Sequence, residues 1–297
     1  MISAYINFFR DLSLDKISAY LQLMRFDRPI GILLLLWPTL WALWIAAEGF
    51  PNVKNFLVFC TGVVIMRAAG CVINDYADRD LDGHVKRTES RPLPAGQVTP
   101  AEALVLFSLL LLIALLLVLT VNRMTIYLAF AGAALTLLYP FAKRFTWFPQ
   151  VILGLAFGWS IPMAFAAENK PLTELTWLIF FTNLIWTMVY DTIYAMVDRD
   201  DDLKVGIRST AILFGDADRL LIGVMQIMVV IGLMIIGTHL EFGWVFSIAV
   251  LLVIALFAGQ QMLIRKRQRD DCFRAFVNNN YVGLVIFIGI LIEYLQK

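Results

Sequence analysis

Two acidic segments of this chain each follow a long apolar stretch. Residues 74–82 read NDYADRDLD and residues 191–202 read DTIYAMVDRDDD. In a helix, Asn74, Asp78 and Asp82 would lie on one face, because they recur every four residues. A second stripe would contain Asp191, Tyr194, Asp198 and Asp202. Paired stripes of carboxylates and an amide are typical of a site that binds a cation.

Facing stripes would bring at least four carboxylates within several ångströms of one another. Two carboxylates about 4 Å apart repel by about 4 kcal/mol at an effective dielectric constant of about 20, so a cation must lie among them. All-oxygen ligands favour Mg²⁺ or Ca²⁺, and Mg²⁺ usually completes its coordination with water and a substrate phosphate. Basic residues in the two following loops suit the phosphate oxygens; they are Lys86, Arg87, Arg91, Lys204 and Arg208. Together these residue types predict a diphosphate site.

Other acids of both segments are expected to point away from the stripes and to be solvated; they are Asp75, Asp80, Asp200 and Asp201. A charge run at a helix end is often only a solvated loop, but its repetition after two apolar segments favours a site. Residues 78–89 also match the calcium-loop pattern D-x-D-x-D-G-x5-E. We interpret that match as a coincidence, because the second segment has Leu203 and Ser209 in place of the glycine and the glutamate.

The elements that must position these residues are membrane helices. Of the 297 residues, 60% are hydrophobic and 16% are charged, and uncharged runs long enough to cross about 30 Å of hydrocarbon recur along the chain. Two further runs are each interrupted by one charge, Arg67 or Asp191. The expected fold is an all-α integral membrane protein, a single domain over residues 1–297, with nine transmembrane helices. Their expected ranges are 29–47, 55–74, 103–122, 124–142, 145–167, 175–197, 220–240, 242–264 and 275–292.

The distribution of basic residues predicts the orientation in the membrane. Most of the 24 Lys and Arg residues lie in the N-terminal arm and in the loops after the second, fourth, sixth and eighth helices. Such residues are retained on the cytoplasmic side, so the N-terminus is expected inside and the C-terminus outside. Residues 4–24 mix charges with large apolar side chains, which suits an interfacial helix rather than a cleavable signal. The three cysteines predict neither a disulfide nor a thiolate metal site.

Arg67 and Asp191 are charges inside predicted membrane helices, and each costs about 2.5 to 3.5 kcal/mol on insertion scales. Two explanations for them stay open. The two side chains could form an ion pair across the bundle, or Arg67 could lie near the ligand. One explanation does not exclude the other.

Longer segments carry a family resemblance. NDYADRDLD resembles the NDxxDxxxD motif, and DTIYAMVDRDDD the DxxYxxxDxxxD motif, of the UbiA superfamily of membrane prenyltransferases. The likeness spans about residues 21–295 and is closest to the branch that prenylates 4-hydroxybenzoate in ubiquinone synthesis. The segments that carry it are 25–44, 67–96, 139–144, 153–167 and 190–215. We interpret residues 67–96 and 190–215 as a pseudo-repeat, and we expect its two halves to meet at the site.

The resemblance implies a bundle with a central cavity that opens sideways to lipid and is capped by cytoplasmic loops. It implies transfer of a polyprenyl group from polyprenyl diphosphate to the 3-position of 4-hydroxybenzoate, with release of diphosphate, in a bacterial inner membrane. Mg²⁺ would be the cofactor, and its ligands would be Asn74, Asp78, Asp82, Asp198 and Asp202. The diphosphate oxygens would be bound by Arg87, Arg91, Lys204 and Arg208.

The expected chemistry is attack by the acceptor ring, at the carbon ortho to its hydroxyl, as the allylic C–O bond stretches toward a carbocation. Asp191 is the candidate that orients the phenol or takes up its proton, with Arg67 and Tyr194 as catalytic neighbours. An arginine would bind the acceptor carboxylate through a bidentate contact, and the sequence does not rank the candidates. They are Arg25, Arg28, Arg67 and Arg144, and the polar rim would be completed by Tyr139 and Lys143.

Two alternatives keep the same fold. Another aromatic acceptor would use the same donor site, and only the acceptor pocket would differ. A divalent-cation or organic-anion transporter would also use repeats and intramembrane acids, but the external loops hold no matching charged cluster for a second gate. The expected partners are the two substrates and the lipid bilayer, with no nucleic acid, and the prenyl chain length and oligomeric state stay open.

Overall fold

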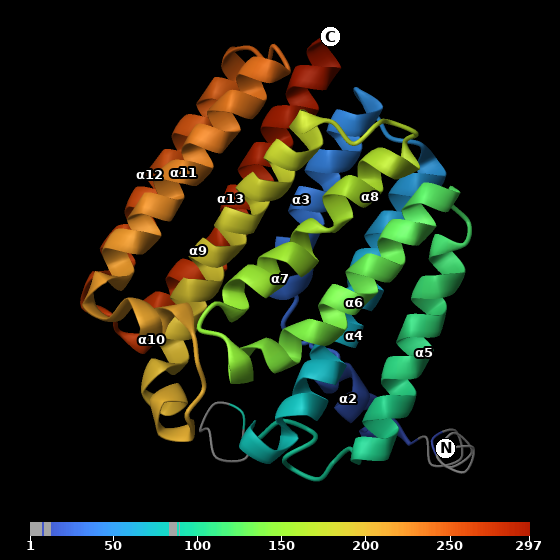
Figure 1. Ribbon diagram of the computed structural model, residues 1–297, viewed down its shortest axis with the longest axis vertical. Helices are drawn as coiled ribbons and strands as arrows, with labels where there is room; N and C mark the ends of the chain where they lie inside the picture. The colour runs from blue at the N-terminus through green and yellow to red at the C-terminus, as the bar shows by residue number, and fades with distance from the viewer. Residues whose placement is uncertain (1–7, 9–12, 83–87, 89) are drawn as a thin grey trace.

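The computed structural model describes residues 8, 13–82, 88 and 90–297. All regular elements in this part of the chain are helices, and they lie side by side in one bundle (Figure 1). The α-helices are α2 Leu14–Leu23, α3 Ile30–Ala47, α4 Val53–Asp82, α5 Pro100–Val118, α6 Arg123–Phe145, α7 Pro149–Gly158, α8 Ser160–Ala167, α9 Glu174–Val205, α10 Thr210–Phe214, α11 Asp218–His239, α12 Trp244–Leu263 and α13 Arg269–Gln296. Two short 3₁₀ helices are Gly215–Ala217 and Ile264–Lys266.

Within the described residues, nine helical segments are long and apolar enough to cross a membrane, which confirms the predicted number. α7 and α8 share one of these segments, Pro149–Ala167, and α10 and α11 share another, Thr210–His239. The short α2 precedes them and exposes Leu14, Ile17 and Leu21, as expected for a helix that lies at the interface. The chain is therefore a multi-span membrane protein.

One predicted helix, 145–167, is interrupted at Trp159, where α7 ends and α8 begins. Pro162 has no amide N–H, so it cannot donate the helical hydrogen bond to the carbonyl of Gly158. The Trp159 amide makes a long bond of 3.4 Å to the Ala156 carbonyl. Both parts belong to one span, Pro149–Ala167, so the predicted membrane crossing is present, with a break beside the proline that lies inside its apolar run.

The buried apolar side chains form two clusters. The larger one joins α3, α8, α9, α11, α12 and α13, and it includes Trp41, Trp186 and Val253. The smaller one joins α2, α4 and α5 through side chains such as Leu23 and Val72. Helices from both clusters contribute to the wall of the cavity described below, so the site lies where the two clusters meet.

Hydrogen bonds between polar side chains hold α13 against its neighbours. Asn279 accepts a bond from Trp186 Nε1 of α9 at 3.0 Å, and Asn280 accepts one from Trp37 Nε1 of α3 at 2.8 Å. Gly283 of α13 packs so closely against Trp37 that a Cβ atom would not fit. Because donors in hydrocarbon must find partners within the protein, these bonds specify how α3, α9 and α13 pack.

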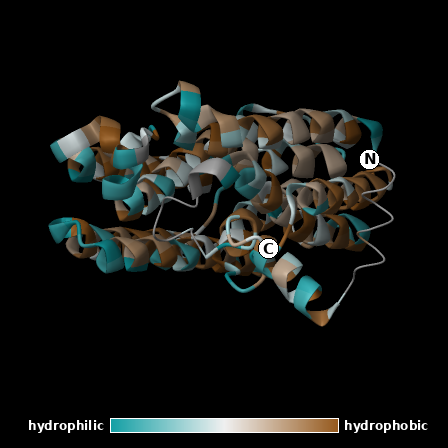
Figure 2. Cartoon of the chain, turned by 90° about the horizontal axis from the view of Figure 1, so that it is seen from below, coloured by the Kyte–Doolittle hydropathy of each residue, from teal (hydrophilic) through white to brown (hydrophobic). Residues whose placement is uncertain are grey.

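The two acidic segments form the ends of α4 and α9. α4 continues to Asp82 and α9 to Val205, so both segments are helical, as the stripes require. α9 stops where Gly206 takes a left-handed conformation, with φ of 74°. Both ends lie at the lower end of the bundle in Figure 1, whereas the C-terminus lies at the upper end. Figure 2 shows the molecule from below, with hydrophobic residues along much of each helix.

Candidate active site

A cavity of about 1120 Å³ lies among the helices α3 to α9 and α13. Its charged and amide side chains come mainly from α4, from α9 and from the loops 25–29, 88–92 and 207–209, and Lys143 of α6 adds one more. Apolar residues of α5, α6, α7 and α8 line much of the rest. Both acidic stripes face into this one space, which brings together the two segments that the sequence predicts to form the site.

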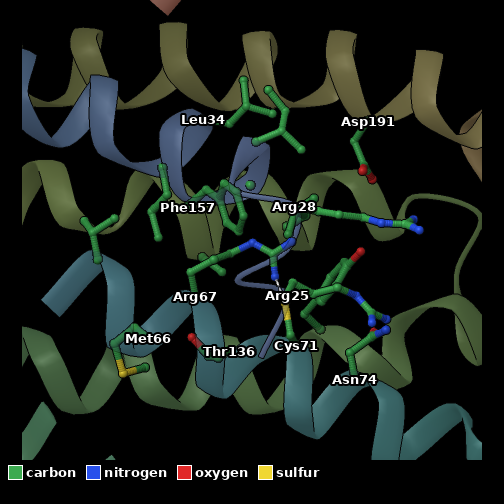
Figure 3. Close-up of a pocket in the computed structure, with 18 of the residues that line it drawn as sticks. Arg25, Arg28, Leu34, Met66, Arg67, Cys71, Asn74, Thr136, Phe157 and Asp191 are labelled. Carbon is green, nitrogen blue, oxygen red and sulfur yellow. Dashed lines mark hydrogen bonds between the residues drawn. The ribbon is translucent and has the colours of Figure 1, made fainter. Parts of the chain in front are cut away.

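The α4 stripe lines the cavity through Arg67, Cys71, Asn74 and Asp78. Arg67 donates a hydrogen bond to the Cys71 sulfur. Figure 3 shows Arg67 and Asn74 on one wall of the space and Asp191 pointing into it from the opposite wall. The two stripes therefore face each other across the cavity.

Arg67 is half-buried in the wall and has no acidic partner among the described residues. The ion pairs at this cavity join other residues, and among the described residues none joins Arg67 to Asp191. The ion-pair explanation is therefore wrong, although the Arg67 charge acts on Asp191 electrostatically. The Arg67 Nε atom has no hydrogen-bond partner in the described part of the chain. Gly31 of α3 lies directly against the guanidinium, where a Cβ atom would not fit.

Asp75 corrects one sequence prediction, because it is buried rather than solvated, with 1% of its surface exposed. Arg25 Nη2 donates to both of its carboxylate oxygens at 2.9 Å, and Arg91 Nη1 donates to Oδ1 at 3.0 Å. The prediction failed because Arg25, which precedes α4 in the sequence, and Arg91, which follows it, both bind the Asp75 carboxylate. Arg25 and Arg91 line the cavity as expected, but both are engaged by Asp75.

Lys143 and Tyr139 lie one turn apart on α6, and both line the cavity. Lys143 forms an ion pair with Asp78. The Tyr139 hydroxyl lies within electrostatic range of Asp78, Asp191 and Arg67. The polar rim expected from these two residues is therefore present at the charged end of the cavity.

In the described part of the chain, the expected cluster of four or more carboxylates is not formed. Among the described residues, no three acids, histidines or cysteines lie close enough together to hold a metal ion by themselves. The physical reason is that basic side chains neutralise Asp75 and Asp78 at the α4 end of the cavity. Asp82 is the last residue of α4, but its side chain and the whole of Arg87 lie outside the described part of the chain.

The α9 stripe lines the opposite wall, and its members are Asp191, Tyr194, Asp198 and Asp202. Two of its neighbours were not predicted. Gln150 of α7 also lines the cavity, and Phe276 of α13 packs against Tyr194 with ring centroids 4.6 Å apart. Their sequence signal is weak: Gln150 is an uncharged amide in an apolar run, and Phe276 is one of 22 phenylalanines.

Two further predicted basic residues contribute to the wall. Arg28 lines the cavity but is 67% exposed, with Asp27 at 3.5 Å. Arg208 lines the cavity beside the α6 end, where its guanidinium lies over the Trp147 ring at 5.3 Å.

Two other predicted basic residues do not line the cavity. Arg144 follows Lys143 on α6, so its side chain leaves from a different face and donates to the Ala77 carbonyl. Lys204 lies in the last turn of α9, is exposed, and pairs with Asp201 at 3.4 Å. The structure therefore gives no support to the predicted substrate contacts of these two residues.

The apolar part of the cavity continues between α5 and α6, away from the charged end. Small side chains line it from both helices, including Ala114 and Val118 of α5 and Ala129 and Ala133 of α6. We refer to this part, lined by the second half of α5 and by α6, as the apolar branch. Its lack of charged side chains suits a hydrocarbon chain rather than a polar ligand.

Comparison with known proteins decides the family. A sequence model of the UbiA prenyltransferase family matches residues 35–288. The chain belongs to this family. A 4-hydroxybenzoate octaprenyltransferase of Vibrio campbellii is 58% identical over 283 residues, which cover 95% of this chain and 100% of that protein. A protein of the same name from Psychromonas ingrahamii is 55% identical over 281 residues, covering 95% of this chain and 98% of the relative. These relatives leave no support for the transporter alternative.

Solved structures of UbiA homologues share the fold. An apo structure from Aeropyrum pernix has a TM-score of 0.77 at 23% identity and covers 88% of this chain and 97% of that one. A homologue from Archaeoglobus fulgidus bound to GPP and Mg²⁺ has a TM-score of 0.70 at 16% identity and covers 92% of this chain and 99% of that one. At these identities the likeness concerns the fold, and it agrees with the expected all-α membrane bundle.

Proposed function

We propose that this family member transfers a polyprenyl group from polyprenyl diphosphate to carbon 3 of 4-hydroxybenzoate, with release of diphosphate, in ubiquinone synthesis. The observation that carries the proposal is one cavity in which a charged end continues into an apolar branch. Such a cavity suits a donor with an anionic head and a long hydrocarbon tail. The names of the relatives supply the two chemical groups, an octaprenyl group and 4-hydroxybenzoate.

We propose Mg²⁺ as the cofactor, with ligands drawn from Asn74, Asp78, Asp82, Asp198 and Asp202. The donor set fits, because an amide and several carboxylates line one end of the cavity from facing walls, and such oxygens suit Mg²⁺. When bound, Mg²⁺ would neutralise negative charge on the diphosphate leaving group. The structure of a distant homologue bound to GPP and Mg²⁺ agrees with this choice.

Basic side chains would bind the diphosphate at the same end of the cavity as the proposed metal ligands. The backbone N–H of Arg208 donates to the Lys143 carbonyl at 3.3 Å, so these two cations lie on adjoining parts of the wall. Their charge would stabilise the leaving group while the allylic C–O bond breaks. Arg25 and Arg91 are held by Asp75, so they would contribute to a preorganised positive wall.

Arg67 is the arginine that we assign to the acceptor carboxylate. Of the other candidates, Arg25 is engaged by Asp75, Arg28 is largely exposed, and Arg144 does not line the cavity. Arg67 is half-buried in the wall, has no acidic partner among the described residues, and has a buried Nε atom available for a hydrogen bond. A guanidinium in this state is suited to a bidentate bond with a carboxylate.

Asp191 would act at the other end of the acceptor. It faces Arg67 from the opposite wall (Figure 3), so a ring bound by its carboxylate at Arg67 can turn its hydroxyl toward Asp191. The Asp191 carboxylate would accept a hydrogen bond from the phenol, which raises electron density at the ortho carbon that attacks the donor. Tyr194 lies between Asp191 and Asp198 on the stripe, at the level where donor and acceptor would meet.

We further propose that the charged end faces the cytoplasm of a bacterial cell, in the inner membrane. The helix ends and loops rich in Lys and Arg lie at the end of the bundle opposite the C-terminus (Figure 1), and such residues are retained inside. The donor head would then enter from the cytoplasmic leaflet while its tail stays in hydrocarbon.

The proposal is tested with purified protein, Mg²⁺, octaprenyl diphosphate and ring-labelled 4-hydroxybenzoate. We expect a labelled, lipid-soluble product whose mass equals that of 4-hydroxybenzoate plus one octaprenyl group minus one hydrogen. Formation of this product should cease when EDTA removes the divalent cation. Absence of product with 4-hydroxybenzoate, together with turnover of a different aromatic acceptor, would overturn the acceptor assignment.

A further inference from the structure

Asp218 is the first residue of α11, and its side chain is fully buried. It belongs to neither acidic stripe and does not line the cavity. A carboxylate buried away from water is costly unless it is paired and hydrogen-bonded. The residues that bind Asp218 therefore indicate what this buried charge holds together.

Two arginines from different elements bind the Asp218 carboxylate. Arg267, which lies between α12 and α13, donates from Nη2 to Oδ1 at 2.7 Å and from Nε to Oδ2 at 2.9 Å. Arg199 of α9 donates from Nη1 to Oδ2 at 3.0 Å. Because a bidentate contact fixes orientation as well as distance, Asp218 joins the end of α9 firmly to the start of α11 and to the segment before α13.

Arg269, the first residue of α13, binds the same part of α9. Its Nε donates to the Val197 carbonyl at 2.7 Å, and its Nη2 donates to Asp201 Oδ2 at 2.6 Å. Val197 and Asp201 are four positions apart in the sequence, so these contacts span one turn of the helix. Together with the bond between Arg199 and Asp218, they attach this turn to both α11 and α13.

The same part of α9 presents the two carboxylates that we propose as its Mg²⁺ ligands. Asp198 and Asp202 line the cavity, whereas Arg199 and Asp201 do not. Neighbouring residues of an α-helix point about 100° apart, so the two carboxylates lie on one face and the residues that bind α11 and α13 lie on another. A rotation or shift of this turn would therefore move both carboxylates relative to α4.

We propose that Asp218, acting through Arg199, and Arg269 are positioning residues for the donor site. They hold the last turns of α9 from the side away from the cavity, so that Asp198 and Asp202 meet Mg²⁺ and the diphosphate in a fixed orientation. The inference rests on the donor site proposed above. Removing a group that orients metal ligands typically lowers metal affinity about 10- to 100-fold.

The packing of α9 against α11 does not depend on these ion pairs alone. Ile193 of α9 and Ile222 of α11 are fully buried in the larger apolar cluster. Loss of the bond between Arg199 and Asp218 should therefore loosen the end of α9 while the two helices stay packed. Asp218 would keep Arg267 as a partner, so replacing Arg199 leaves no buried carboxylate without a counter-ion.

Hydrogen–deuterium exchange of the full-length protein, without metal or substrate, tests the hold on α9. Arg199→Met keeps the apolar length of the side chain and removes its donors. We expect backbone exchange in residues 197–205 to become about 10-fold faster or more, whereas exchange in residues 222–236 of α11 stays as in the wild type. Arg199→Lys should recover much of the protection, because a lysine can supply the single bond that Arg199 Nη1 makes to Asp218.

Calorimetry with the non-reacting donor geranyl S-thiolodiphosphate then tests the effect on the site. In Arg199→Met we expect the Mg²⁺ concentration that gives half-maximal binding of this analogue to rise about 10-fold or more, and Arg199→Lys should restore it in part. Arg274→Met is the matched control, since Arg274 pairs with Asp271 of its own helix and does not line the cavity. This control should match the wild type in both exchange and binding.

Wild-type exchange in residues 197–205 of Arg199→Met would overturn the inference, because the ion pair would then not hold α9. Faster exchange with an unchanged Mg²⁺ requirement would also overturn it, since the ligands would not depend on this hold. Wild-type binding in Asp198→Ala would instead refute the donor site itself, and the inference with it. If Arg199→Met does not purify as a folded protein, Arg269→Met replaces it, because that side chain is 43% exposed, and the same results decide.

Discussion

Arg67 and Asp75 are two charges in the wall of one cavity that are compensated in different ways. Asp75 is held by two arginines, whereas Arg67 contacts a thiol and has no acidic partner among the described residues. A buried charge without a counter-ion is costly, and an anionic ligand would offset that cost. This difference is the physical reason for assigning the acceptor carboxylate to Arg67 rather than to the other arginines.

Replacing Arg67 by lysine tests the assignment. Lysine keeps the charge but loses the planar pair of donors, so we expect KM for 4-hydroxybenzoate to rise at least about 10-fold. KM for octaprenyl diphosphate should change little, because its head is bound by other residues. Arg123→Lys, at the start of α6 and outside the cavity, is the control and should keep both constants. A rise in KM for octaprenyl diphosphate alone would indicate that Arg67 belongs to the donor site instead.

Gly31 offers an independent test of the proposed contact between Arg67 and the acceptor carboxylate. A Cβ atom at Gly31 would overlap the Arg67 guanidinium, whereas one at Gly259 of α12 would meet nothing within 4 Å. Gly31→Ala should therefore displace Arg67 and raise KM for 4-hydroxybenzoate, although alanine is the better helix former. Gly259→Ala should leave steady-state kinetics unchanged. An unaltered KM in Gly31→Ala would show that the close approach of α3 does not position Arg67.

At the scale of helices, the sequence predicts the spans and both stripes because these depend only on local periodicity and apolar length. The ends of α4 and α9 are helical, and Asn74, Asp78, Asp191 and Asp198 line one cavity as their spacing requires. What the sequence misses is pairing between distant segments. Asp75 is bonded by an arginine 50 positions earlier, and no helical periodicity carries that information.

The apolar branch gives a prediction at this same scale. Ala133 of α6 lines the branch, whereas Ala134 is exposed and does not line it. Ala133→Trp should narrow the branch and lower kcat/KM for octaprenyl diphosphate about 10-fold or more, while a short dimethylallyl donor is affected little. Ala134→Trp is the matched control and should behave as wild type with both donors. Equal loss with both donors in Ala133→Trp would mean that the tail does not occupy the branch.

At the scale of the whole molecule, the two apolar clusters leave one cavity between them, and that cavity joins residues from both halves of the pseudo-repeat. A long hydrocarbon tail and a charged head are thereby accommodated in one space without burying an isolated charge in lipid. The central claim is that α4 and α9 supply a common Mg²⁺–diphosphate site from facing walls.

The most direct test of that claim measures binding of a non-reacting donor, geranyl S-thiolodiphosphate, to the purified protein by isothermal titration calorimetry. We predict binding that requires Mg²⁺ and weakens at least about 10-fold in both Asp78→Ala and Asp198→Ala, since each removes a ligand from one wall. Each variant should still elute as a folded protein in detergent. Wild-type affinity without a divalent cation, or in both variants, would contradict a metal site shared by α4 and α9.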